Sequence, residues 1–198
     1  MRNKALVFIF IFSLFGLPLF SQSFIGFTAG GMPGKVQVKA GIHLEAPLKQ
    51  NLDLLIGIFY QRINTPSLLD LLPNDKNYYD LTISYPGANL SLKQTILNSR
   101  LHIYGLGGFY GQYATLAQAS YQRGFNFESE KRSFVGLGLE RFDVGLSLGL
   151  GIEHTLRKHR KIMVMLAYQH SFTPFYIGAS RYYHQFLLFN AGLLLPLF

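Results

Sequence analysis

The chain has 198 residues, of which 49% are hydrophobic and only 14% are charged, and it contains 20 glycines but no cysteine. Without cysteine we expect no disulfide and no cysteine-linked lipid anchor. The formal net charge is +8, but its basic residues are dispersed among apolar segments, which argues against a nucleic-acid partner. The six histidines are scattered as well, so the sequence predicts no metal or other cofactor.

The first 21 residues predict a secretory signal peptide. Arg2 and Lys4 precede an uncharged apolar run at residues 5–17, and the small residue Ser21 follows as the expected cleavage site. The apolar run is shorter than the ~20 residues that a membrane-spanning helix needs. Residues 22–198 are then predicted to form a single exported domain, and loss of the two basic residues lowers the net charge from +8 to +6.

In chain order, eight segments have the length and the residue pattern of β-strands. They are residues 23–31, 35–48, 52–63, 78–97, 101–118, 142–154, 161–172 and 184–198. The apolar phase changes near Pro86 in the fourth segment, which predicts a β-bulge there. Both faces of the fifth segment mix glycine with aromatic residues, so the pattern does not assign them.

Short and long connections alternate along most of the chain. The longer connections are expected at residues 64–77, 123–141 and 174–183. Short periplasmic turns opposite longer outer loops are typical of outer-membrane barrels, so the pattern also predicts that both termini are periplasmic.

The alternation is clearest at residues 142–154. From Phe142 to Glu153 one face carries only Phe, Val, Leu and Ile, whereas the other carries Asp143, Glu153, one serine and three glycines. An apolar face against lipid and a small face lining a narrow barrel would account for this pattern. The alternative, a soluble lipocalin-like barrel, would need the aliphatic face inside and the glycines in water. The sequence therefore predicts an all-β, eight-stranded, antiparallel up-and-down transmembrane barrel in the outer membrane of a Gram-negative bacterium.

Three segments resemble the PorT-like small outer-membrane β-barrel family (outer membrane protein beta-barrel domain). They are AGIHLEAPLKQNLDLLIGIFYQR (residues 40–62), DLTISYPGANLSLK (residues 80–93) and FDVGLSLGLGIEH (residues 142–154). The last strand, ending at Phe198, is similar to the C-terminal aromatic signal by which such barrels are recognised for assembly. The resemblance implies the barrel assembly machinery as a partner during biogenesis, and a secretion-linked role. The chain departs from the family in its very short first outer loop and in Pro196.

Four charged residues are predicted to face the barrel interior near one end: Glu45, Asp53, Lys93 and Glu153. A buried charge without a partner is costly, so we expect an interior ion network that includes a pair between Lys93 and Asp53. The alternative is a path for protons or ions, which charges inside a membrane sometimes mark.

The densest basic run lies in a predicted periplasmic turn and contains Arg157, Lys158, Arg160 and Lys161. It is expected to contact phospholipid phosphates, or else to dock a periplasmic partner.

His170 and Ser171, together with Glu153 and His154, contain the residue types of a hydrolase triad. Adjacent strand residues point to opposite faces, so this set is a weak candidate.

We therefore expect a non-enzymatic structural or accessory component of an envelope assembly. Its surroundings would be phospholipid and lipopolysaccharide, and its partner a larger outer-membrane or secretion complex. The alternatives are a lipid-modifying enzyme of the lipid A hydrolase type and a narrow channel.

Overall fold

A computed structural model describes residues 24–32, 35–64, 77–99, 101–123, 125–134, 137, 139–156, 159–177 and 181–196. These residues form ten strands. Their bounds are β1 Phe24–Met32, β2 Lys35–Lys49, β3 Leu52–Asn64, β4 Asn77–Asn98, β5 Leu101–Tyr113, β6 Leu116–Arg123, β7 Asn126–Arg132, β8 Phe142–Thr155, β9 Lys161–Ile177 and β10 Arg181–Pro196. The predicted signal peptide and Phe198 lie outside the described residues.

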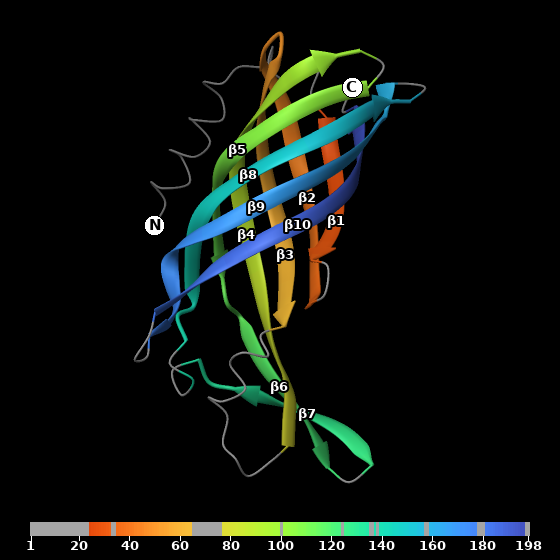
Figure 1. The fold of residues 1–198 in the computed structure, drawn as a ribbon. Coiled ribbons are helices and arrows are strands. Elements are labelled where there is room, and N and C mark those ends of the chain that lie inside the picture. The colour runs from red at the N-terminus through yellow and green to blue at the C-terminus, as the bar shows by residue number, and fades with distance from the viewer. Residues whose placement is uncertain are drawn as a thin grey trace, which may run out of the picture.

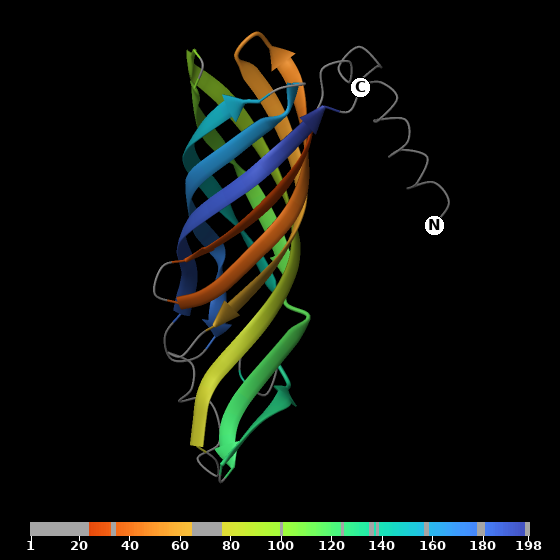
Figure 2. The same cartoon turned by 90° about the vertical axis from the view of Figure 1, so that its right-hand side faces the viewer.

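Eight of the strands close into a ring (Figures 1 and 2). Around the ring the order is β1, β2, β3, β4, β5, β8, β9 and β10, every pairing is antiparallel, and β10 pairs again with β1. The predicted eight-stranded up-and-down barrel is therefore confirmed. We call the end that carries the β2–β3, β4–β5 and β8–β9 connections the short-turn end, at the top of Figure 1, and the opposite end the long-loop end.

The two strands outside the ring correct the predicted fifth strand and the connection after it. The predicted strand at residues 101–118 ends at Tyr113, and a separate hairpin of β6 and β7 occupies residues 116–132. β6 pairs with the far half of β4, so these three strands extend beyond the barrel as a small sheet. Charged residues alternate in β7 with little apolar content, so no hydrophobic period marked it as a strand.

The expected long loop at residues 174–183 is also wrong. β9 continues to Ile177 and β10 begins at Arg181, and Pro174 lies within β9 opposite Tyr183. The β9–β10 register shifts on both sides of Tyr183. This irregular ladder accommodates the proline, because proline in a sheet is tolerated where regular pairing is interrupted.

The faces of β8 agree with the sequence prediction. Leu148 and Leu150 are 49% and 64% exposed on the outside of the barrel, which rules out the lipocalin arrangement. On the inside, Tyr110 and Tyr104 of β5 lie across from Gly145 and Gly151. A Cβ atom at Gly145 would come within 2.6 Å of the Tyr110 hydroxyl oxygen, and one at Gly151 would overlap the Tyr104 ring. The glycine face of β8 therefore makes room for the tyrosines of β5.

Pro86 does not mark a bulge, contrary to the prediction. The β3–β4 register runs without a shift through Pro86, which lies opposite Tyr60. What changes at this point is the partner on the other side: β5 pairs with β4 from Gly87 onward, and β6 pairs with β4 up to Ser84. The strand keeps its faces and changes its surroundings.

No helix in the described part of the chain has both the length and the apolar character needed to span a membrane.

Candidate functional site

Four predicted interior residues meet at the short-turn end around the ammonium group of Lys93. Its Nζ atom lies 2.7 Å from Glu45 Oε1, 2.5 Å from Glu153 Oε1 and 3.6 Å from Asp53 Oδ2. The residues come from β2, β3, β4 and β8, so the cluster bridges across the ring. The predicted Lys93–Asp53 pair is present, because the two residues are cross-strand neighbours. The two glutamates nevertheless lie closer to Lys93.

Lys161, at the start of β9, completes this group. Its Nζ atom lies 3.6 Å from both Glu45 Oε1 and Glu153 Oε2, and 4.2 Å from the centre of the Phe24 ring. Three carboxylates and two ammonium groups thus form one network, which we call the charged layer: Glu45, Asp53, Lys93, Glu153 and Lys161.

The centre of the charged layer is shielded from water, whereas the side chains of Asp53 and Lys161 at its edge are 19% and 20% exposed. Glu45, Lys93 and Glu153 are each 2% exposed, and the neighbouring Tyr104 is fully buried. Ions in a low-dielectric interior remain charged only when each is paired closely. Lys93 lies 2.7 Å from Glu45 and 2.5 Å from Glu153, so these buried groups are paired closely enough to remain charged.

The predicted basic docking run is divided by the structure. Lys161 belongs to the charged layer rather than to a solvated turn, which corrects its predicted position. Arg160 is exposed at the short-turn end. Arg157 and Lys158 lie outside the described residues.

A second polar group, which the sequence did not reveal, surrounds Asp143 toward the long-loop end. Its Oδ2 accepts hydrogen bonds from Gln112 Nε2 at 2.7 Å and from His184 Nδ1 at 3.2 Å. Its Oδ1 accepts from Ser171 Oγ at 2.5 Å and from Thr173 Oγ1 at 3.2 Å. Four strands contribute to this cluster, so no local motif could have shown it.

The Asp143 cluster contains serine, histidine and aspartate, but its bonds run differently from those of a hydrolytic triad. In a triad the serine hydroxyl bonds to the imidazole and the imidazole to the acid. Here Asp143 itself accepts from both Ser171 and His184. Ser171 is 1% exposed, whereas His170 lies on the outer face between the rings of Tyr168 and Phe172. The structure therefore keeps the suggested His170–Ser171 pair on opposite faces.

The long-loop end of the lumen is filled by buried apolar side chains, which we call the mouth cluster. Its members are Ile63, Leu81, Ile83, Tyr85, Ala114, Ala117, Ala119, Phe134, Leu137, Leu139, Phe186 and Leu188. β4 and β10 stand on opposite sides of the ring, so contacts among these residues cross the lumen. The segment after β7 supplies Phe134, Leu137 and Leu139, which join the cluster from outside the ring.

Beyond this mouth, β4, β6 and β7 form the projecting sheet (Figure 2). One of its faces is ordered by side-chain contacts: Tyr78, Glu130 and Arg132 are mutually bonded, and Tyr121 donates to Glu128 at 2.7 Å. At the hairpin tip Phe125 and Phe127 are 102% and 71% exposed. Among the described strands β7 is the last in the sheet order, and β6 is the strand that pairs with it.

Within the described residues, no group of three or more histidine, aspartate or glutamate side chains is arranged to hold a metal ion.

A closed eight-stranded ring with an apolar outer face and charges paired inside has the architecture of a small integral outer-membrane β-barrel.

No family model and no curated protein matches the sequence. Solved structures of three small barrels are similar in shape. The N-terminal β-barrel domain of Pseudomonas aeruginosa OprF has a TM-score of 0.47 and 8% identity, covering 88% of this chain and 98% of that one. Neisserial surface protein A has a TM-score of 0.46, 12% identity and coverages of 88% and 94%. Ail, the attachment invasion locus protein of Yersinia pestis, has a TM-score of 0.40, 12% identity and coverages of 87% and 95%. At these scores the similarities carry no argument about function.

Proposed function

We propose that the protein is an integral outer-membrane barrel of a Gram-negative bacterium that acts as a non-enzymatic accessory component of an envelope assembly. The membrane location is supported by the outer surface, where large apolar side chains of every ring strand whose outer face is described are exposed. Examples are Ile58 at 66%, Phe109 at 60% and Leu150 at 64% exposure. Such a belt in contact with water would be unfavourable by about 25 cal/mol per Å² of apolar surface.

The projecting sheet is the observation that carries the accessory role. Among the described residues the barrel interior is filled near both ends, by the charged layer and by the mouth cluster, which favours an accessory role over a channel. The exposed Phe125 and Phe127 and β7, the last of the described strands in the sheet, offer contacts to another protein. Exposed aromatic residues and edge strands are typical sites of protein recognition.

In this proposal the partner is a larger outer-membrane or secretion complex, and the PorT-like, secretion-linked role is one form of it. Phospholipid and lipopolysaccharide surround the barrel, and the barrel assembly machinery inserts it. With periplasmic termini, the projecting sheet lies on the cell surface and the short-turn end faces the periplasm.

Photo-crosslinking in cells tests the accessory role. A photoreactive phenylalanine analogue at position 127 is expected to yield a discrete protein adduct in the outer-membrane fraction. The same analogue at Phe109, in the belt, serves as the matched control and should yield lipid adducts only. Adducts that are the same from both positions, or absent from position 127, would count against the accessory role. Recovery of the protein outside the outer-membrane fraction would count against the location.

A lipid-modifying activity has one observation in its favour, the presence of serine, histidine and aspartate around Asp143. Its test is separate: lipid A profiles with and without the protein, and with Ser171→Ala, are expected to be identical. A lipid A species that appears with the natural chain and disappears with Ser171→Ala would establish the enzyme instead.

A further inference from the structure

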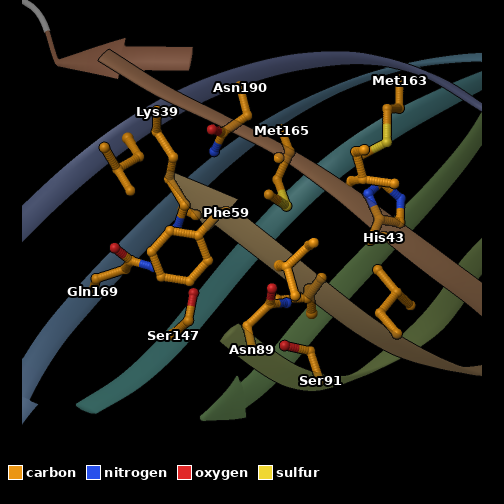
Figure 3. A pocket seen from close by; sticks show the side chains of 17 residues that line it. Lys39, His43, Phe59, Asn89, Ser91, Ser147, Met163, Met165, Gln169 and Asn190 are labelled. Carbon is orange, nitrogen blue, oxygen red and sulfur yellow. The ribbon is translucent and has the colours of Figure 1, made fainter. Parts of the chain in front are cut away.

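A cavity with a mixed polar and apolar lining lies in the barrel between the charged layer and the mouth cluster (Figure 3). Its volume is about 70 Å³, and its polar lining residues include Lys39, Asn89, Ser91, Ser147, Gln169 and Asn190. None of the 17 lining residues is an acid. The cavity is therefore lined by the ammonium group of Lys39, the imidazole of His43, neutral hydrogen-bonding groups and apolar side chains, in contrast to the charged layer beside it.

Lys39 differs from the other two lysines that point into the barrel. Lys93 and Lys161 each contact at least two carboxylates. In the described part of the chain no carboxylate oxygen lies within 4.0 Å of Lys39 Nζ. This atom instead lies 3.9 Å from the centre of the Phe59 ring. A cation–π contact offsets only part of the desolvation of an ammonium group, so the site favours a counter-ion.

The neutral groups around Lys39 are placed to donate. In Figure 3 the amide nitrogens of Asn190 and Gln169 lie on the side of Lys39 and Phe59. The Asn190 amide oxygen occupies the space that Gly30 leaves, where a Cβ atom would overlap it. Ser91 Oγ and His43 Nε2 are buried and have no hydrogen-bond partner among the described residues. Both lie on residues that line the cavity and can serve as ligand contacts.

From this lining we infer that the cavity binds a small monovalent inorganic anion, such as chloride, between Lys39 and the amides of Gln169 and Asn190. A volume of about 70 Å³ is several times the ~10–15 Å³ that one water needs, so an ion fits together with water. One ammonium group balances one negative charge, whereas a divalent anion would leave a buried charge uncompensated. This site is independent of the proposed accessory role.

The test is thermal unfolding of the refolded, detergent-solubilised protein, in which chloride replaces gluconate at constant ionic strength. A ligand that binds the folded state raises the folded-to-unfolded ratio by a factor of 1 + [L]/Kd. Well above Kd, each tenfold rise in chloride concentration should therefore raise the folded-to-unfolded ratio tenfold. We expect the melting temperature to rise accordingly. Sulfate stabilises folded proteins generally by exclusion from their surface, so any rise with sulfate should be equal in the natural chain and in a Lys39→Met variant.

Matched variants assign the effect to the cavity. Lys39→Met is expected to abolish the chloride dependence and Lys39→Arg to retain it. Lys131→Met serves as a control because Lys131 is exposed on β7, and it should behave as the natural chain does. An equal dependence in Lys39→Met and Lys131→Met, or a natural chain indifferent to chloride, would overturn the proposal.

Crystals of the natural chain grown in bromide give a second readout, which does not depend on any variant folding. Anomalous scattering from bromide within hydrogen-bond distance of Lys39 Nζ is the expected result. A cavity that contains only water under these conditions would refute the anion site.

Discussion

The two halves of β4 share one alternation but have opposite chemistry on each face. From Gly87 to Lys93 the inner face is polar, with Asn89, Ser91 and Lys93, and the outer face presents Leu90 and Leu92 at 51% and 47% exposure. Before Pro86 the inner face is apolar, with Leu81, Ile83 and Tyr85 in the mouth cluster. The outer face of that half carries Asp80, Thr82 and Ser84, and the Tyr60 hydroxyl donates to Ser84 Oγ at 2.8 Å.

The surroundings of the strand, rather than the strand itself, therefore decide which of its faces is apolar. A strand with lipid outside must place its apolar residues outward. Beyond the lipid belt the strand instead buries its apolar residues inward, as an ordinary soluble sheet does, and its polar outward residues Thr82 and Ser84 are themselves covered, at 6% and 5% exposure. The reversal at Pro86 therefore places the edge of the lipid-contacting belt on β4 at this residue, and each of the following substitutions tests one side of that edge.

The largest effect is expected in the polar interior of the membrane half. Lys93→Met leaves Glu45 and Glu153 buried beside Lys161 alone, and removal of one partner of a buried ion pair costs about 3–5 kcal/mol. We expect the free energy of unfolding to fall by this amount. Far-UV circular dichroism in a denaturant titration measures it, because the chain has no tryptophan for fluorescence. Adding Glu45→Gln and Glu153→Gln should restore much of the loss. A single variant as stable as the natural chain would show that the layer contributes no net pairing.

On the other side of the edge, the interior should respond as a hydrophobic core. Ile83 is fully buried in the mouth cluster, and Ile→Ala in a core costs about 2–5 kcal/mol. The same denaturant titration is expected to show a loss in this range for Ile83→Ala. The control is Ser91→Ala, an inward residue of the same strand and parity in the membrane half, which should change stability by less than about 1 kcal/mol. Similar values for both would remove the distinction between the halves.

A charge placed on the outer surface compares the belt with the projecting sheet. Leu150→Arg puts a guanidinium group where lipid is expected, at a cost of about 2–4 kcal/mol near the bilayer midplane. Phe127→Arg, on an equally accessible position of the hairpin, should change stability by no more than about 0.5 kcal/mol. Folding into lipid vesicles followed by denaturant titration distinguishes the two. A Leu150→Arg chain that loses nothing would mean that this face does not contact lipid.

The membrane half was predictable because each of its strands has the same surroundings along its whole length. Lipid outside and a narrow interior produce the strict alternation of β8, and the charged residues of the interior could be placed by counting from the short turns. Lys161 was misplaced because its neighbours in the sequence are basic, and its ion partners lie on β2 and β8. The Asp143 cluster is a similar case, since its members come from four strands and only closure of the ring brings them together.

Beyond the membrane half, the sequence pattern was harder to interpret. The buried residues of β6 are Ala117, Ala119 and Tyr121, and β7 has little apolar content, so neither strand carries a strong apolar alternation in the sequence. In β4 the reversal of chemistry resembled a change of phase, and a bulge at Pro86 was the simplest explanation within a single strand. The actual cause is a change of partner strand and of surroundings, and neither is a local property of the sequence.

The smallest effect is expected at Pro86 itself. Ser84 directs its carbonyl oxygen toward the segment between β5 and β6, accepting from the Thr115 amide at 2.9 Å. Because backbone groups of alternate residues face the same neighbour, position 86 faces the gap where the β5 ladder has ended and the β6 ladder has not begun. Pro86 therefore forfeits no ladder hydrogen bond, and Pro86→Ala should change the free energy of unfolding by only about 0.5 kcal/mol.

Ala88→Pro is the matched control for this position. Residue 88 faces the same side as Pro86 but lies opposite Gly111 in the β5 ladder. Proline there removes a backbone donor from a paired strand in the lipid region, where each unsatisfied backbone group costs several kcal/mol. If Pro86→Ala and Ala88→Pro proved equally mild, position 88 would lie outside the regular ladder. If both were severe, Pro86 would be fixing the backbone itself, and the edge of the belt would depend on the proline rather than on the change of partner.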